Sequence, residues 1–223
     1  ILTGFSPLNC GMDKAPEIWA TINCGGVASN AIFLPDGTGQ NFLLVEDSSL
    51  RRIDADGNVV WSRGGDAVFY DQLHGDGTYT LGVLSGSVLS LVDPATGRDF
   101  WRYEFPVGCS LRQGKIRVGT APPDIGGKCI AVFPGHCEEG YLFIFRKSQR
   151  EPELLWKTTE ANVTNLPKVA DHGVQTLIEP DGSVIWNVRR WCVLAFDAGS
   201  GRLLQRREFE SGGQKRRNYG TPV

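Results

Sequence analysis

Carboxylates followed closely by glycine are the residues of this chain whose spacing could do chemistry. They occur in the segments 54–58 (DADGN) and 71–77 (DQLHGDG). Alternating carboxylates beside glycine suit loops that hold hard cations such as Ca²⁺, which takes oxygen ligands. Neither segment supplies the bidentate glutamate of a full calcium loop, and the first also reads as a tight hairpin turn. We therefore keep Asp71 and Asp76 as candidates for a metal site with Ca²⁺ as its ion, and we expect no other cofactor.

No pattern of covalent or acid–base catalysis accompanies these carboxylates. The chain lacks a nucleophile elbow, a phosphate-binding loop and a dinucleotide fingerprint. His74 and His172 each follow an aspartate at similar places and could bind metal as a pair. A metal site needs three or four ligands, so we expect both to be exposed loop residues. We name no catalytic residue.

The elements that position these residues form a sequence repeat that occurs four times. Each copy is an apolar strand, a polar turn and a second strand. The copies cover 50–63, 89–105, 141–158 and 193–209. Their apolar runs are short, rich in β-branched and aromatic residues, and bounded by Gly, Asp and Pro, which indicates strands and hairpins rather than helices. Trp61 lies 42 residues after Trp19, Trp101 follows 40 residues later, and Trp156 another 55. All-strand repeats of roughly 40 to 50 residues are typical of propeller blades.

The copy of the repeat that matches a known pattern most fully runs from Leu91 to Trp101. Its Asp93, Thr96, Gly97 and Trp101 match the pattern Ala-x-Asp-x-x-Thr-Gly-x-x-x-Trp. The segment therefore resembles the tryptophan-docking repeat of the quinoprotein dehydrogenase-like (PQQ-repeat) β-propellers, with leucine in place of the usual alanine. The resemblance implies that the tryptophan packs between neighbouring blades and that the aspartate and threonine bond the turn.

The other copies depart from this pattern in different ways. The last keeps Asp197 and Gly201 but has Gln205 at the tryptophan position, and the first is shortened. The third keeps its tryptophan, loses the aspartate and has a longer turn. The resemblance assigns a structural role to nine residues: Asp54, Trp61, Asp93, Thr96, Gly97, Trp101, Trp156, Asp197 and Gly201.

We therefore predict an all-β chain that forms a β-propeller or part of one. It would have about four near-complete four-stranded blades, plus flanking strands of incomplete blades, within one domain, 1–223. The expected blades are about 28–64, 66–105, 115–158 and 166–209. The strand around Trp19 reads as the last strand of a preceding blade, and 218–223 reads as the innermost strand of a following one. We thus expect a piece of a larger secreted or membrane-anchored protein, or a ring completed by another chain.

Charge and hydropathy exclude some partners. The 23 basic and 25 acidic residues give a net charge of −2, which leaves no electrostatic footprint for nucleic acid. No apolar stretch of about 18 or more residues is present, so no transmembrane span is expected within the chain.

Six cysteines and one glycosylation sequon bear on the compartment. None of the cysteines forms a CxxC pair, which disfavours structural zinc. Cys10 with Cys24 and Cys129 with Cys137 are close enough in sequence to pair, which would leave Cys109 with Cys192, although sequence alone does not determine connectivity. Buried free thiols are the alternative. With the sequon at Asn162, disulfides predict an extracellular, luminal or periplasmic protein.

Candidate partner contacts come from loops and from one aromatic residue without a role in the repeat. Trp191, beside Arg189 and Arg190, has the residue types that dominate binding hot spots. The third expected blade, 115–158, contains long insertions at 122–128 and 147–153, which we expect at the propeller rim.

The leading functional hypothesis is a non-catalytic scaffold or recognition module that binds a protein or glycan through its rim loops. A rigid ring with many variable loops suits that role. One alternative is a fragment of a quinone-dependent oxidoreductase, as the resemblance implies. Another is a luminal sensor domain that dimerises.

Overall fold

Short antiparallel strands make up nearly all the regular structure in the described part of the chain. The computed structural model describes residues 49–54, 56–107, 109, 111, 115–134, 139–146, 149–159, 175–189 and 192–209. It also gives the backbone of strands 2–5, 18–22, 30–35, 41–46 and 218–219. None of the described residues belongs to a helix that is long and apolar enough to cross a bilayer.

The strands form four sheets, which we call blades 1 to 4, and one small flanking sheet. The flanking sheet pairs β1 (Leu2–Phe5) with β2 (Ile18–Ile22). Blade 1 contains β3 (Asn30–Pro35), β4 (Asn41–Glu46), β5 (Leu50–Ile53) and β6 (Val59–Arg63). Blade 2 contains β7 (Asp66–Asp71), β8 (Thr80–Ser85), β9 (Val88–Val92) and β10 (Asp99–Glu104). Blade 3 contains β11 (Ile116–Thr120), β12 (Lys128–Val132), β13 (Gly140–Phe145) and β14 (Glu153–Thr158). Blade 4 contains β15 (Gln175–Ile178), β16 (Val184–Arg189), β17 (Cys192–Asp197), β18 (Leu203–Glu208) and β19 (Asn218–Tyr219).

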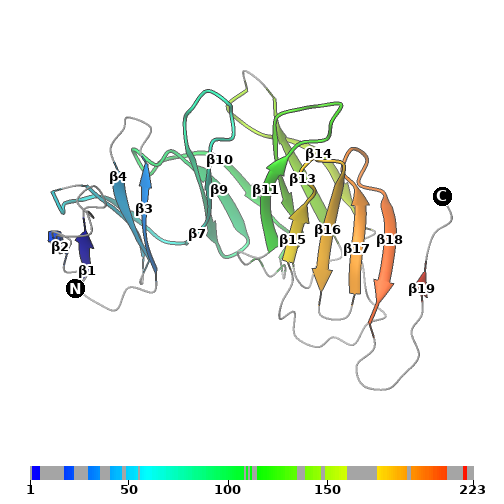
Figure 1. Ribbon diagram of the computed structural model, residues 1–223, viewed down its shortest axis with the longest axis horizontal. Coiled ribbons are helices and arrows are strands. Elements are labelled where there is room, and N and C mark those ends of the chain that lie inside the picture. The colour runs from blue at the N-terminus through cyan, green and yellow to red at the C-terminus, as the bar shows by residue number, and fades with distance from the viewer. Residues whose placement is uncertain are drawn as a thin grey trace, which may run out of the picture.

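The blades follow one another along the molecule in sequence order, and each is an antiparallel meander (Figure 1). The first strands of blades 2, 3 and 4 contact one another in turn, β7 against β11 and β11 against β15. First strands therefore lie innermost and fourth strands outermost, which is the arrangement of a propeller. The flanking sheet and β19 lie at opposite ends of the view, so the described strands form a partial propeller.

Each outer strand carries one β-bulge at the same place. Pairing with the third strand skips one residue near the start of β6, β10, β14 and β18: Val60, Phe100, Leu155 and Leu204. The next residue is the tryptophan of the repeat in three blades and glutamine in the fourth: Trp61, Trp101, Trp156 and Gln205. Because a bulge re-aims the side chains around it, this irregularity puts the repeat's tryptophans at equivalent positions.

The core lies between the blades, and the two sides of a strand belong to different clusters. In β13, Tyr141 and Phe143 pack toward blade 2, whereas Leu142 and Ile144 pack toward blade 4. All four are at most 1% exposed. Side chains alternate between the faces of a strand, so a strand covered on both faces is apolar without interruption. That is why the segment GYLFIF shows no polar alternation.

Two cysteines expected in disulfides are free thiols. Cys129 lies on β12 and Cys192 on β17, and both are buried in the apolar cluster between blades 3 and 4. The Cys129 thiol donates to the Thr120 carbonyl at 3.2 Å. The expected pairings of Cys129 with Cys137 and of Cys109 with Cys192 are therefore corrected, because these two positions face a packed core where cysteine acts as a small apolar residue. Cys109 is disulfide-bonded.

Burial should make both free thiols inert in the folded protein. Removal from water raises the pKa of Cys129 to about 12 and raises that of Cys192, and the thiolate is the reactive form. We expect iodoacetamide at neutral pH to leave both unmodified in the native chain and to alkylate both after unfolding without reductant, as located by peptide mass spectrometry. Rapid native labelling of either would contradict this packing.

The last described strand differs from its expected place. Asn218 and Tyr219 were expected to begin a further blade, but β19 pairs with the outer strand β18, opposite Arg207 and Arg206. An outer strand offers unpaired backbone groups to any neighbouring segment, which is why the fifth strand adds there. The assignment of the residues between the sheets to one blade or the next stays a prediction.

Candidate ligand-binding pocket

Two of the three blade junctions are closed by a docked tryptophan. The Trp61 indole nitrogen of blade 1 donates to the Pro94 carbonyl of blade 2 at 2.9 Å. The Trp156 nitrogen of blade 3 donates to the Ala198 carbonyl of blade 4 at 2.8 Å. Each acceptor directly follows the aspartate of the repeat.

The glycines of the repeat lie against these indoles. A Cβ at Gly97 would lie 2.7 Å from the ring of Trp61, and one at Gly201 would lie 2.7 Å from the ring of Trp156. Only a residue without a side chain lets the ring approach so closely.

The aspartates of the repeat hold the turns together. Asp93 accepts from the Ala95 amide at 2.8 Å and from the Thr96 hydroxyl at 3.1 Å. Asp197 accepts from the Ser200 hydroxyl at 2.6 Å and from its amide at 2.8 Å. These hydrogen bonds from Ser200 are the main cause that lowers the pKa of Asp197 below its usual value. The carboxylates are therefore used by their own turns.

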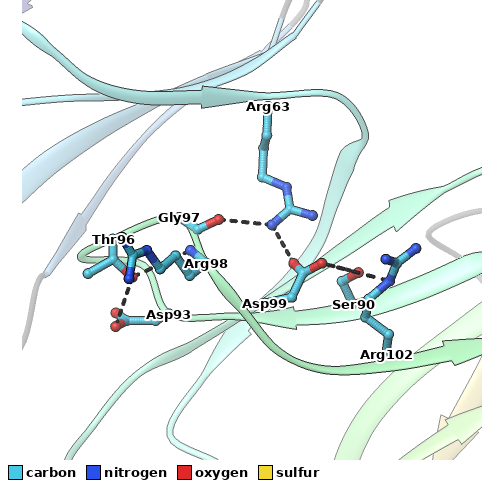
Figure 2. A network of polar contacts seen from close by, with 8 residues as sticks. All are labelled: Arg63, Ser90, Asp93, Thr96, Gly97, Arg98, Asp99 and Arg102. Carbon is cyan, nitrogen blue, oxygen red and sulfur yellow. Dashed lines mark hydrogen bonds and ion pairs between the residues drawn. The ribbon is translucent and has the colours of Figure 1, made fainter.

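An arginine reinforces the junction between blades 1 and 2 (Figure 2). Arg63, at the end of β6, donates to the Gly97 carbonyl at 3.1 Å and pairs with Asp99 at 2.6 Å. The other oxygen of Asp99 accepts from Ser90 at 3.3 Å and faces Arg102 at 3.8 Å. This network fixes the start of β10, from which Phe100 projects.

The segment 54–58 is a hairpin turn. The Asp54 carboxylate accepts from the amides of Asp56 at 3.0 Å and Asn58 at 2.8 Å. These bonds, with the one from Asn58 contributing most, lower the pKa of Asp54. The first of the two sequence segments considered for Ca²⁺ thus uses its carboxylate within the turn.

The junction between blades 2 and 3 is built differently. Trp101 packs edge-on against Phe143 of β13, with ring centroids 5.2 Å apart, and stacks with Tyr103 at 6.1 Å. Tyr103, Phe105 and Tyr141 continue this aromatic cluster. Blade 3 lacks the Asp and Gly of the repeat in its last turn, so its turn offers no matching site for an indole.

A pocket of about 480 Å³ lies at this junction, on the rim formed by the first and last turns of each blade. Its walls come from the β7–β8 loop, the β9–β10 turn, the start of β10 and the β13–β14 turn. The lining residues are His74, Asp76, Thr78, Tyr79, Thr80, Asp93, Phe100, Gln149 and Arg150. Its place in the fold corresponds to the turn that receives the indole at the other two junctions.

Packing and hydrogen bonds hold the β7–β8 loop in place. Leu73 is 2% exposed in the core between blades 2 and 3. Tyr79 stacks on Tyr70 with centroids 4.5 Å apart and planes at 8°. Asp76 accepts from the Thr78 hydroxyl at 2.6 Å and from its amide at 2.9 Å. The hydroxyl bond contributes most to a pKa of Asp76 below the usual value, so this carboxylate is ionised at neutral pH.

His74 is packed among aromatic rings rather than exposed as expected. Its ring meets Phe145 edge-on at 5.4 Å and lies 6.2 Å from Phe100. Its Nδ1 atom is buried and has no hydrogen-bond partner. A buried polar atom without a partner costs free energy, and here it belongs to a residue that lines the pocket.

Arg150 closes one side of the pocket. Its guanidinium carbon lies 4.8 Å from the centroid of Phe100, in cation–π geometry. Arg150 reaches from blade 3 to the bulged residue of blade 2, so this contact crosses the junction that lacks an indole hydrogen bond.

The other candidate site residues lie elsewhere. Asp71 faces Lys128 at 3.5 Å and is not among the residues that line the pocket with Asp76. Within the described ranges, no group of three or more His, Cys, Asp or Glu is placed to hold a metal ion. Arg189 donates to Asn187 at 2.7 Å. The predictions for Cys10, Cys24, Cys137, Asn162, His172, Arg190 and Trp191 lie outside the described residues.

Sequence reasoning named the rim insertion 147–153, which holds Gln149 and Arg150, but missed its grouping with Tyr79 and Phe100 in one site. One signal was available: the turn that carries Gln149 and Arg150 is the one copy of the repeat without its aspartate and glycine. A turn that has lost the structural residues of the repeat no longer receives an indole, so its side chains can line a binding site.

Comparisons with known proteins support the fold alone. No family model and no curated protein matches the sequence. Among solved structures, rhamnogalacturonan lyase YesW matches with a TM-score of 0.52 and 15% identity, over 91% of this chain and 44% of that one. The rhamnogalacturonan lyase PL11 of Bacillus licheniformis matches with a TM-score of 0.50 and 14% identity, over 79% and 41%. This chain thus spans less than half of the length of either protein.

Proposed function

We propose that this chain is a non-catalytic recognition module that binds a protein or glycan partner through the loops of one propeller rim. The observation that carries the proposal is the pocket between blades 2 and 3. The β13–β14 turn beside it has lost the Asp and Gly of the repeat, and the pocket combines aromatic rings with charged and amide side chains. Pockets that join apolar walls to a few polar groups are the usual sites of ligand recognition.

The chemistry of the repeat supports binding rather than catalysis. The carboxylates of Asp54, Asp93 and Asp197 accept hydrogen bonds within their own turns. A catalytic acid or base must be within reach of a substrate proton, and these three groups are engaged in holding strands together. Of the two acidic residues that line the pocket, Asp93 belongs to the turn that receives the Trp61 indole, whereas Asp76 does not.

A longer parent protein and membership of the quinoprotein-like propellers belong to the same proposal. The docked indoles of Trp61 and Trp156 support that membership. They equally support the second candidate, a fragment of a quinone-dependent oxidoreductase. The disulfide at Cys109 supports an oxidising compartment.

The test is to screen the fluorescently labelled chain against a glycan array and an array of acidic, basic and neutral peptides. Gln149→Trp puts a bulky ring at an exposed lining position and should abolish the binding that the native chain shows. Glu104→Trp adds the same ring at an exposed position at the far end of β10 and should leave the binding intact.

Two results would overturn the proposal. One is that the native chain binds neither the glycan array nor the peptide array. The other is binding that Gln149→Trp leaves unchanged. For the oxidoreductase candidate, Ca²⁺ with added quinone should raise the melting temperature and produce quinone absorbance that stays with the protein after gel filtration.

A further inference from the structure

The pocket already receives a cation from the chain itself. Arg150 places its guanidinium over the ring of Phe100 at 4.8 Å. No salt bridge joins Arg150 to an acid of the described residues. The side chain is exposed, so it can leave the ring without breaking an ion pair.

The charges around this ring favour a positive group. Asp76 and Asp93 bring two carboxylates to the lining, and Arg150 is the one lysine or arginine among the lining residues that the structure describes. Asp76 and Asp93 outnumber Arg150, and the lining becomes more negative when Arg150 swings out. An incoming anion would meet both carboxylates, whereas an incoming cation would be attracted by them.

The walls also suit the flat head and apolar stem of a basic side chain. Phe100 offers a ring face, and Tyr79 adds a second ring to the lining, covered on one side by Tyr70. Arginine uses this combination of aromatic face and carboxylate in protein interfaces. The cavity of about 480 Å³ has room for one such side chain.

We propose that the rim pocket between blades 2 and 3 binds an arginine or lysine side chain of a protein partner, which replaces Arg150 over Phe100 and pairs with Asp76. This inference rests on the proposed recognition function and specifies its ligand. Arg150 then acts as an internal competitor, held in place until a partner's cation displaces it.

The test uses three short probes on the whole chain: the peptides Ac-Gly-Arg-Gly-amide and Ac-Gly-Glu-Gly-amide, and a neutral methyl glycoside. Binding is followed by chemical-shift changes in ¹H–¹⁵N spectra. We expect saturable binding of the arginine peptide at the resonances of Asp76, Thr78 and Phe100. The affinity should fall with added salt, because the attracting charges are at the surface.

Two variants should change the affinity for the arginine peptide in opposite directions. Asp76→Asn should weaken binding of the arginine peptide about two- to fivefold, since an exposed charge pair is lost. Arg150→Ala should strengthen it about two- to fivefold, since the competing cation–π contact is removed. The matched control is Asp181→Asn, because Asp181 accepts from the Ser183 amide at 3.0 Å and hydroxyl at 2.8 Å in the corresponding turn of blade 4. It should leave the affinity unchanged.

Each other outcome overturns the inference. Binding of the glutamate peptide that Arg150→Ala abolishes would make the pocket an anion site. Binding of the glycoside alone would make it a sugar site. If no probe binds while Gln149→Trp still abolishes array binding, the assigned ligand is wrong and the recognition function stands. If Gln149→Trp has no effect on the arrays, the recognition function itself fails.

Discussion

Replacing Trp156 by alanine should destabilise the protein by about 3 to 5 kcal/mol, the usual cost of removing a large aromatic side chain from a core. Trp156 is 9% exposed, packs in the cluster between blades 3 and 4, and donates to the Ala198 carbonyl. Its loss would open a cavity and leave a buried carbonyl without a donor. The free energy of unfolding, from urea denaturation followed by circular dichroism, gives the value.

A pair of milder substitutions separates packing from hydrogen bonding. Trp156→Phe keeps a ring but removes the indole donor, so it should cost about 1 kcal/mol more than Trp101→Phe. Trp101 packs against Phe143 and Tyr103 and makes no indole hydrogen bond in the described part of the chain. Equal costs at the two positions would show that the bond to Ala198 contributes nothing.

Gly182→Ala should cost roughly 2 to 5 kcal/mol, from overpacking together with a left-handed backbone. Gly182 lies in the β15–β16 turn with φ +75°, and a Cβ there would lie 2.3 Å from the Ala121 carbonyl oxygen and 2.8 Å from that of Thr120. Both atoms belong to the backbone of blade 3, so no side-chain rotation relieves the collision. Blades 3 and 4 would have to move apart.

Gly86→Ala is the matched control for this prediction. Gly86 has φ +61° in the β8–β9 turn and has no atom within 4 Å of a Cβ. Gly86→Ala has the backbone strain without the collision, so it should lower the free energy of unfolding by about 1 kcal/mol. If chemical denaturation gives equal losses for Gly182→Ala and Gly86→Ala, the close approach of the two blades is incorrect.

Residue types and spacing predicted the all-β partial propeller because its turns depend on local chemistry. Asp93, Thr96 and Gly97 form their turn through bonds within a few residues, and such bonds leave a regular trace in the sequence. The hydrogen-bond partner of a docked indole is distant in sequence: Pro94 lies 33 residues after Trp61. Packing of the tryptophan against the next blade was therefore predicted only from the repeat as a whole.

The pocket could not be predicted in the same way. Asp76, Phe100 and Arg150 come from three separate turns, and only the packing of blade 2 on blade 3 brings them together. The bulge that aims Phe100 is a matter of strand register, which single residues do not reveal. Free thiols were only the alternative for Cys129 and Cys192, because the sequence does not show that both positions lie in the apolar cluster between blades 3 and 4.

The open outer strands also bear on self-association. Within the described residues, β19 covers β18, whereas β6, β10 and β14 end their sheets without a further partner. On β10 and β14, charged residues of both signs discourage a second copy from adding to the edge. On β6, Val59 and Val60 are 52% and 48% exposed. Among the outer edges at β6, β10 and β14, the β6 edge of blade 1 is therefore the least protected against pairing with a second copy of this chain.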